Sequence, residues 1–210
     1  MNRWIIITII SFVVIVILLS LTVFKSRIKS AFYIDHMERP ERTEHMHIAR
    51  IVETLNIQAG DIIADIGAGS GLFAREFAVQ ATSSGKIYAV DINSEILKHI
   101  DQTSKEKGIT NIITIHSSEN DPKIPGKVDL IFMCDTLHYI DQQEAYVRSM
   151  SSHIKTNGRI AVVSFHKNWP PMANKFSQQE LTAWMNKAGL TLLESHDFIQ
   201  DEYLNIYRKK

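Results

Sequence analysis

The chain has little of what marks several large classes of protein. Its 210 residues include one cysteine, Cys134, which excludes an internal disulfide and a cysteine-based metal cluster. Lysine and arginine together number 23, as do aspartate and glutamate, so there is no net charge to attract nucleic acid. The only closely spaced histidines, His45 and His47, are two residues apart and would point to different faces of a helix. We therefore expect no disulfide scaffold, no nucleic-acid partner and no metal site.

One long apolar run is present, at the N-terminus. Residues Trp4–Phe24 carry no charged side chain and match the roughly 20 residues that a helix needs to cross a bilayer. A cleaved signal peptide is the alternative, but the run is longer than usual and no small-residue cleavage site follows it. The positive-inside rule predicts a single-pass protein with its body on the cytoplasmic side. The basic residues compared are Arg3 before the run and Lys25, Arg27 and Lys29 after it.

The remainder divides into a connector and one domain. We assign residues 1–29 to a membrane anchor with a basic cytoplasmic flank, 30–42 to a linker and 43–210 to the domain. Residues 30–42 show no clear period and mix aromatic with charged side chains, which fits a solvated linker and a substrate lid equally well. The apolar spacing that begins at Thr43 and includes Leu55 predicts an amphipathic helix.

After this helix, apolar strands alternate with helical patterns. Such alternation predicts an α/β fold in which parallel strands are joined by right-handed crossovers, as in a doubly wound sheet. Two late apolar stretches are close enough to pair as an antiparallel hairpin at the sheet edge. The expected strands are Ile62–Ile66, Ile87–Asp91, Ile112–His116, Val128–Cys134, Arg159–Phe165, Thr191–Leu193 and Tyr203–Tyr207, and the helices between them begin at Gly71, Ser94 and Asp141.

Three local signals support the ends of these helices. Asp141 with Glu144, and Ser177 with Glu180, have the spacing of a capping box at a helix N-terminus. Gly189 stands where the last helix should end. Asp129, at the start of its strand, is interpreted as a residue that holds neighbouring backbone.

The most informative segment is the loop after the first strand. Gly67, Gly69 and Gly71 alternate along it and lead into a helix, so a ligand can lie against bare backbone and helical N–H groups. A dinucleotide fingerprint requires Gly-x-Gly-x-x-Gly, but the third position of that pattern is Leu72 here. The spacing therefore disfavours a nicotinamide or flavin dinucleotide, and a Walker loop is disfavoured because Gly-Lys-Ser/Thr is missing.

Two carboxylates accompany this loop. Asp65, near the end of the first strand, would repel a pyrophosphate and attract an amino group, which favours a zwitterionic amino-acid moiety. Asp91 ends the second strand, where a carboxylate can accept both hydrogen bonds of a ribose diol. The two acids and the glycines together are more specific than any one of them.

On these motifs, ADIGAGSG and YAVDIN, the chain resembles the class I S-adenosylmethionine-dependent methyltransferases over roughly residues 39–208. The resemblance implies a Rossmann-like fold and S-adenosylmethionine as cofactor. It places the methionine part at Asp65 and the loop and the ribose at Asp91 and Ile92, whereas Glu119 or Asn120 is the candidate beside adenine and Ser118 occupies one alignment of the usual acid. The loop residues are Gly67, Ala68, Gly69 and Gly71.

The end of the fourth strand is the expected place of the chemistry, because ligands of doubly wound sheets bind at the carboxyl ends of the strands. Asp135, His138 and Tyr139 are the candidate catalytic residues there. His138 has the right type of side chain for a base, but a histidine that packs under the cofactor or caps the next helix is an equally good interpretation. Cys134 is interpreted as a core residue. His166 and Trp169 either line a substrate pocket or lie in a surface loop.

These features together predict a membrane-anchored methyltransferase. An acceptor that is itself lipid-like, such as a quinone precursor or a phospholipid headgroup, would be concentrated at the membrane surface, and the pattern is closest to the quinone C-methyltransferase branch. A non-catalytic, membrane-tethered scaffold that keeps the cofactor site is the alternative, and a nicotinamide-dependent oxidoreductase is less favoured. The sequence predicts no particular oligomeric state.

Overall fold

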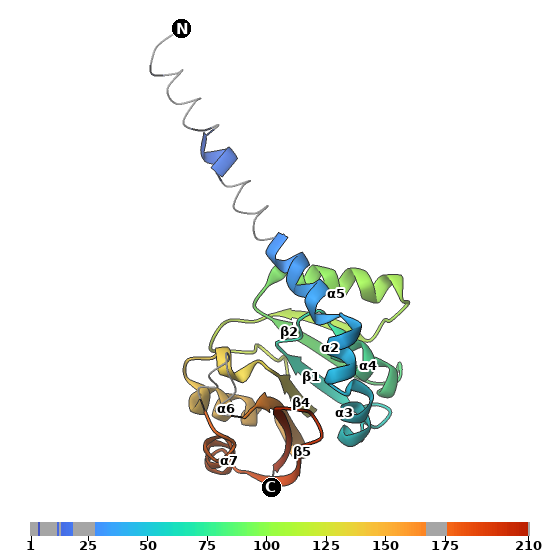
Figure 1. Ribbon diagram of the computed structural model, residues 1–210, viewed down its shortest axis with the longest axis vertical. Helices are drawn as coiled ribbons and strands as arrows, with labels where there is room; N and C mark the ends of the chain where they lie inside the picture. Colours follow the sequence, from blue (N-terminus) through green and yellow to red (C-terminus); the bar gives the residue numbers. More distant parts are fainter. Residues whose placement is uncertain (1–3, 5–11, 13, 19–27, 167–175, 210) are drawn as a thin grey trace.

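The computed structural model of the protein describes residues 4, 12, 14–18, 28–166 and 176–209. Within these residues one seven-stranded sheet has the order β3-β2-β1-β4-β5-β7-β6 (Figure 1). The first five strands are parallel and β7 is antiparallel to both β5 and β6, which confirms the predicted sheet and its C-terminal hairpin. The strands are β1 Ile62–Ile66, β2 Lys86–Asp91, β3 Ile112–His116, β4 Val128–Cys134, β5 Ile154–Phe165, β6 Leu190–His196 and β7 Glu202–Lys209.

Helices cover both faces of this sheet (Figure 1). Buried side chains of α3, α4 and α5 form one apolar cluster with one face, and those of α6 and α7 form a second cluster with the other. Both faces of a parallel sheet must be covered in this way because its strands are apolar on both sides. The helices are α2 Pro40–His45, α3 Ile48–Leu55, α4 Leu72–Gln80, α5 Ser94–Glu106, the 3-10 turn η1 Leu137–Tyr139, α6 Gln143–Ser152 and α7 Gln178–Lys187.

Most of the predicted local signals at the ends of helices and strands are confirmed. The Ser177 hydroxyl accepts from the backbone N–H of Glu180, whose carboxylate accepts from the backbone of Ser177, so this capping box is confirmed. Asp129 accepts from the backbone N–H of Ile62 at 2.9 Å and thus holds the start of β1 to β4. The Asp141 capping box was wrong: η1 shifts the start of α6, so that Gln142 occupies the cap position and makes no side-chain cap bond.

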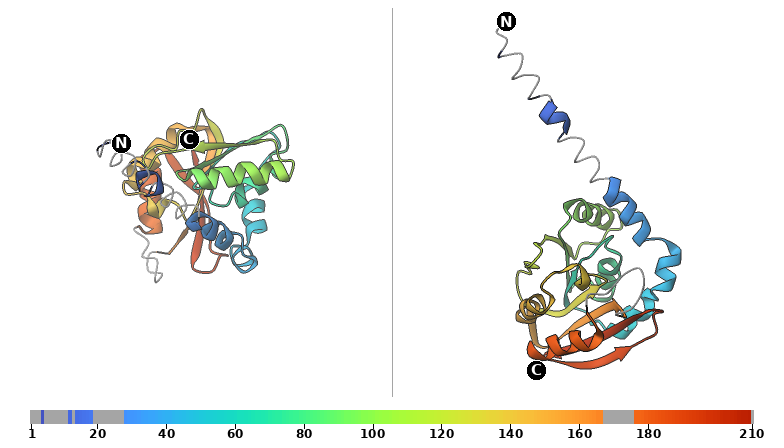
Figure 2. Two further views of the ribbon diagram at one scale, coloured as in Figure 1. Left: turned by 90° about the horizontal axis from the view of Figure 1, so that it is seen from above. Right: turned by 60° about the vertical axis from the view of Figure 1, so that its left-hand side comes forward.

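The segment before the domain contains more helix than its pattern suggested. Residues 28–37 are helical, and α2 follows after a short break. The single helix expected from Thr43 to Leu55 is instead two, because His47 adopts the left-handed conformation at φ 48° between α2 and α3. Figure 2 shows this N-terminal segment running along one side of the domain.

The predicted membrane span, Trp4–Phe24, lies largely outside the described residues, although residues 4, 12 and 14–18 are helical. Within the parts of the chain that are described, no helix is long and apolar enough to cross a membrane.

Candidate active site

A pocket of about 650 Å³ opens at the carboxyl ends of β1, β2 and β4. This is the edge at which doubly wound sheets bind ligands, and the volume suits a small molecule or a cofactor. The described residues that line it are Tyr33, Ile66, Gly67, Asp91, Ile92, Asn93, Ile96, Ser117, Ser118, Glu119, Asn120, Asp135, Thr136, Tyr139, Ile140, Asp141, Gln142 and Tyr146.

The glycine loop forms the floor between β1 and α4. Gly67 has φ 72° and Gly71 has φ 78°, a region that L side chains rarely adopt. A Cβ atom at Gly67 would collide with the side chain of Thr136, and one at Gly71 would approach the side chain of Ile100 to 2.8 Å. Both positions therefore require glycine for their conformation and for their space, and Gly71 also caps α4 in the left-handed conformation.

Asp91 is fixed at the pocket wall by backbone groups. Its Oδ2 accepts from Gly69 N at 3.2 Å, and its Oδ1 accepts from Asn93 N at 2.8 Å. Burial raises the pKa of Asp91, and these backbone bonds oppose the shift. A carboxylate has about four acceptor positions, so Asp91 keeps capacity for the two hydroxyls of a ribose.

Asp65 lies next to the loop but is not among the lining residues. It is 3% exposed, and its Oδ2 has no hydrogen-bond partner within the described parts of the chain. Burial and the charge of Asp91 raise the pKa of Asp65 to about 7, against a hydrogen bond from the Ala74 backbone at the start of α4. An unsatisfied buried carboxyl oxygen beside the glycine loop fits the amino group of the expected methionine moiety.

The adenine side is formed after β2 and β3. Glu119 and Asn120, the two alternatives from the sequence, both line the pocket, as does Ser118. Ile92, which follows Asp91, lines it too and is 59% exposed. The predicted cofactor residues of this wall are therefore brought together, and the geometry does not choose between Glu119 and Asn120.

The end of β4 supplies the opposite wall. Asp135 and Tyr139 line the pocket, whereas His138 is not among the lining residues. The His138 ring is buried, with ring centres 4.2 Å from Tyr139 and 6.2 Å from Phe165. This placement favours the packing interpretation of His138 over the base.

The remaining candidates from the sequence are Cys134, His166 and Trp169. Cys134 packs partly buried against the apolar cluster, in agreement with its interpretation as a core residue, and burial raises the pKa of its thiol. The ring centre of His166 lies 5.5 Å from that of Tyr203, and His166 is not among the lining residues. Trp169 lies outside the described residues.

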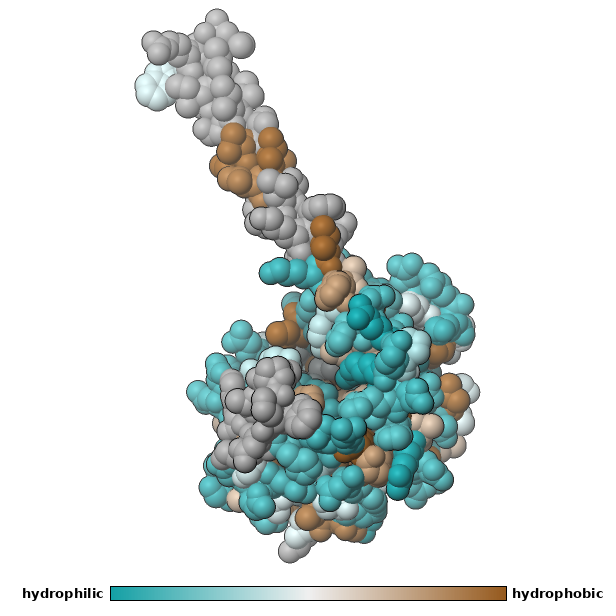
Figure 3. All heavy atoms as spheres, viewed as in Figure 1, coloured by the Kyte–Doolittle hydropathy of each residue, from teal (hydrophilic) through white to brown (hydrophobic). Residues whose placement is uncertain are grey.

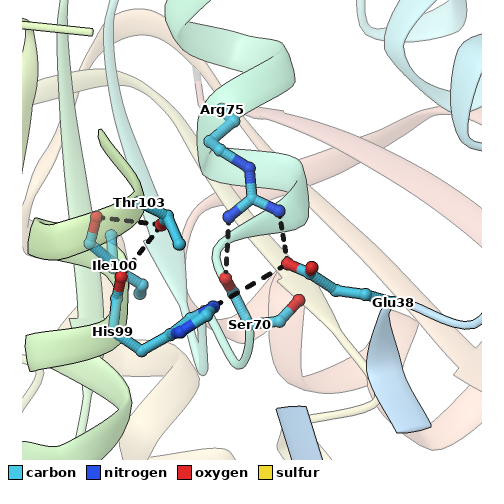
Figure 4. Close-up of polar contacts among 6 residues, drawn as sticks. All are labelled: Glu38, Ser70, Arg75, His99, Ile100 and Thr103. Atoms are coloured by element: carbon cyan, nitrogen blue, oxygen red, sulfur yellow. Dashed lines mark hydrogen bonds and ion pairs between the residues drawn. The ribbon is translucent and has the colours of Figure 1, made fainter. Parts of the chain in front are cut away.

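The segment 28–45 contributes side chains that the sequence did not single out. Glu38 pairs with Arg75 on α4 and lies 4.0 Å from His99, while Arg75 also donates to Ser70 O at 2.9 Å (Figure 4). These contacts attach the segment to the loop Gly67–Gly71 and to α5. The alternation of charge and aromatic residues, which a plain linker does not need, was the available signal.

Two further residues of this segment reach the pocket. Tyr33 lines it, and burial raises the pKa of its phenol to about 12. Arg42 Nη2 lies 3.7 Å from Asp135 Oδ2. Residues 30–42 thus form part of the wall, and the lid interpretation fits these contacts better than the solvated linker.

Comparison with known proteins agrees with this geometry. A family model described as "Methyltransferase domain" matches residues 57–210. A ubiquinone/menaquinone biosynthesis C-methyltransferase of Cupriavidus pinatubonensis is 26% identical over 121 residues, which are 58% of this chain and 50% of that protein. The corresponding protein of Cupriavidus metallidurans is 28% identical over 117 residues, 56% of this chain and 48% of its own. This chain therefore spans about half the length of the curated relatives it matches.

Solved structures show the same fold. A SAM dependent methyltransferase from Aquifex aeolicus superposes with a TM-score of 0.73 at 20% identity, covering 83% of this chain and 95% of that one. The magnesium protoporphyrin IX methyltransferase of Synechocystis with bound SAH gives 0.64 at 12% identity, covering 80% and 83%. At these identities the similarity is one of fold.

Proposed function

Because this chain belongs to the family of the methyltransferase domain, we propose that it transfers a methyl group from S-adenosylmethionine to a small amphiphilic acceptor of the quinol type at a membrane surface. The family assignment confirms the resemblance to class I S-adenosylmethionine-dependent methyltransferases and their cofactor. One observation carries the proposal for turnover: the pocket joins a wall that bears the expected cofactor residues Gly67 and Asp91 to a second wall that bears the ionisable side chain of Asp135.

The residues present fit the cofactor. Asp91 is positioned for the ribose hydroxyls, the loop Gly67–Gly71 with Asp65 for the methionine part, and Glu119 or Asn120 for adenine. When bound, the cofactor supplies an electrophilic methyl group on a sulfonium. The chain then has to hold the acceptor in line with that methyl group and exclude water, which accounts for most of the acceleration of such displacements.

The rim of the pocket supports an acceptor with an apolar part. Ile92 and Tyr139 line the pocket yet are 59% and 66% exposed. Ile28 and Phe32, on the helical segment that also carries Tyr33, are exposed as well. Exposed apolar side chains at a pocket, such as Ile92 and Tyr139, are typical of ligand grooves and membrane contacts. The quinone chemistry in the names of the curated relatives suits such a rim.

The membrane location is supported by the N-terminus. The uncharged run Trp4–Phe24 has the length of a spanning helix and is followed by basic residues. Residues 14–18 expose apolar side chains, which Figure 3 shows in brown above a largely hydrophilic domain surface. We infer a single-pass anchor that places residues 28–210 on the cytoplasmic side.

The test uses the full chain in phospholipid vesicles with radiolabelled S-adenosylmethionine. Reduced naphthoquinones with and without an isoprenoid tail, and phosphatidylethanolamine, are the acceptors compared. We expect label on the ring carbon of the tailed quinol. Tight cofactor binding without transfer to any of the three would contradict the proposal and favour the scaffold, and label on phosphatidylethanolamine alone would replace the quinol class.

A further inference from the structure

Glu202, the first residue of β7, is a buried carboxyl that the cofactor site does not use. It is 2% exposed, and its Oε2 has no hydrogen-bond partner among the residues the structure describes. A carboxylate that is removed from water without full hydrogen bonding is costly, so such a group carries a proton or meets a partner. Packing alone therefore does not account for a carboxyl group at this buried position.

Glu202 and Asp135 lie at the same edge of the sheet. Glu202 is opposite Phe165, the last residue of β5, and the backbone N–H of Asp135 donates to the carbonyl of Val163 on that strand. The two carboxyls therefore flank the carboxyl end of β5 from its two neighbours, β4 and β7. Asp135 lines the pocket and Glu202 is not among the lining residues, so an influence of Glu202 on the pocket would have to pass through a neighbour such as Asp135.

The backbone presents Asp135 in an unusual way. Its φ is 50°, in the left-handed region that costs energy for an L residue and that recurs at functional sites. Its Oδ2 faces Arg42 at 3.7 Å, and its Oδ1 has no partner in the described chain. One carboxyl oxygen of Asp135 is therefore paired with Arg42 on α2, and the other is buried without a hydrogen-bond partner in the described chain.

The charges around Asp135 and Glu202 favour a state in which the two carboxyls hold one proton in total. Burial raises the pKa of Asp135 to about 6, and Arg42 opposes the shift. Burial and the charge of Asp135 raise the pKa of Glu202 to about 8, again against Arg42. Near pH 7 the pair thus holds one proton, on Glu202, and one negative charge, on Asp135. The other titratable groups that act on this pair are Tyr33, Cys134 and Asp201, and Asp65 acts on Cys134.

We propose that Asp135 is the base that removes the acidic proton of the acceptor, and that Glu202 is a positioning residue whose own proton leaves the two carboxyls with one negative charge opposite Arg42. This proposal rests on the proposed function. It requires that the acceptor carry a weakly acidic hydroxyl group, as a phenol or quinol does. A neutral Glu202 keeps Asp135 ionised without adding a second charge, and the single cation of Arg42 then balances the pair.

The atoms balance for a phenolic acceptor. The O–H bond breaks, its proton goes to the carboxylate of Asp135, and the electron pair moves through the ring to form the new carbon–methyl bond. The carbon–sulfur bond of the sulfonium breaks with its electrons left on sulfur. The proton of the ring carbon then returns to the oxygen, so that one proton in total is released through Asp135 to water.

The test that needs no turnover is a carbon-13 NMR titration of carboxyl-labelled Asp and Glu in the full chain in micelles. Asp135→Asn and Glu202→Gln assign the two resonances. We expect midpoints near 6 for Asp135 and near 8 for Glu202, and Asp135→Asn should lower the Glu202 midpoint by a unit or more because it removes the neighbouring charge. Asp197→Asn, an exposed carboxyl nearby, should move neither. Two midpoints below 5, or a Glu202 midpoint unmoved by Asp135→Asn, would overturn the pair.

The kinetic arm separates this proposal from the proposed function. With a tailed quinol, kcat of the wild type should rise through pH 6 and fall above pH 8, and Glu202→Gln should remove the fall because glutamine cannot lose the proton. An alkaline fall that persists in Glu202→Gln contradicts the role of Glu202. If the wild type transfers no methyl group to any quinol, the proposed function fails. The NMR titration still decides whether Asp135 and Glu202 together hold one proton near pH 7.

Discussion

The two halves of the pocket are built by different means. The cofactor half uses backbone: the glycine loop, the helix N-terminus behind it, and Asp91 held by two backbone N–H groups. The acceptor half uses ionisable side chains, Asp135, Glu202 and Arg42, from three separate elements. Backbone groups hold a fixed ligand in one geometry at any pH, whereas buried carboxyls change their charge. We therefore expect cofactor binding to depend on the first half, where Asp65, with a pKa of about 7, is the carboxyl that titrates near neutral pH, and the chemical step to depend on the second half.

The largest effect should come from Asp135→Asn. Removing a positioned base costs roughly 10²–10⁴ in rate, so kcat should fall by that factor while the affinity for S-adenosylmethionine stays within about twofold. A methyl-transfer assay quenched at fixed times measures kcat, and calorimetric titration of the same preparation measures the affinity for S-adenosylmethionine. Loss of cofactor affinity in parallel with kcat would show that the two halves are not separable.

The next largest effect concerns stability and pH. The pKa of Glu202 is raised to about 8 in the folded chain, above the roughly 4.3 of an unfolded glutamate, so its proton stabilises the fold at low pH and this contribution is lost as pH rises through about 8. Between the unfolded and the folded pKa values, each pH unit changes the free energy of unfolding by up to about 1.4 kcal/mol. Urea unfolding at pH 5 and pH 8 should therefore show a smaller pH dependence in Glu202→Gln than in the wild type. Equal slopes would mean that Glu202 titrates normally.

Asp91→Ala should affect the other half. Losing hydrogen bonds to a charged group costs about 1.5–3 kcal/mol, so the affinity for S-adenosylmethionine should fall roughly 10- to 100-fold, with kcat at saturation much less changed. Titration with S-adenosylmethionine, S-adenosylhomocysteine and NADH tests this and the cofactor class together. The exposed Asp101→Asn on α5 serves as the control and should bind both sulfur ligands normally. Binding of NADH would reopen the oxidoreductase interpretation.

The smallest effect should come from the contact that joins the halves. Glu38→Gln leaves Arg75, whose side chain is 10% exposed, without its anionic partner and should lower the free energy of unfolding by about 1–2 kcal/mol. Amide exchange of residues 28–45 should quicken more than that of the sheet. The exposed pair of Asp35 and Arg39 offers a matched control, since Asp35→Asn should change stability by less than about 0.5 kcal/mol. Equal effects of both variants would indicate that the segment is not held through Glu38.

The cofactor half could be predicted from the sequence because its parts are local. A buried strand, three alternating glycines and an acid at the next strand end all lie between Ile62 and Asp91, and the parallel register follows from their pattern. The strands and the C-terminal hairpin could also be predicted, since each strand carries its own apolar signal, whereas the strand order came from the structure.

The acceptor half could not be predicted in the same way. Arg42, Asp135 and Glu202 are far apart in the chain, and only the folded structure brings Arg42 to 3.7 Å from Asp135 and places both charges near Glu202. The break at His47 and the turn η1 were also missed, because neither place carries the glycine or proline that usually marks an interruption of a helix. Nothing in the local sequence distinguishes Glu202, which follows another acid, Asp201, at the start of β7.

The position of Tyr33 has a kinetic consequence. Tyr33, a residue of the pocket wall, is the ninth residue after Phe24, the end of the apolar run, so the two can be at most about 30 Å apart even with an extended chain. If the apolar run lies in a bilayer, as proposed, this wall of the pocket stays within about 30 Å of the membrane. The enzyme and a tailed acceptor then meet by lateral diffusion in two dimensions, and the rate follows the mole fraction of acceptor in the membrane: diluting the vesicles with buffer leaves it unchanged, whereas diluting the acceptor with inert lipid lowers it.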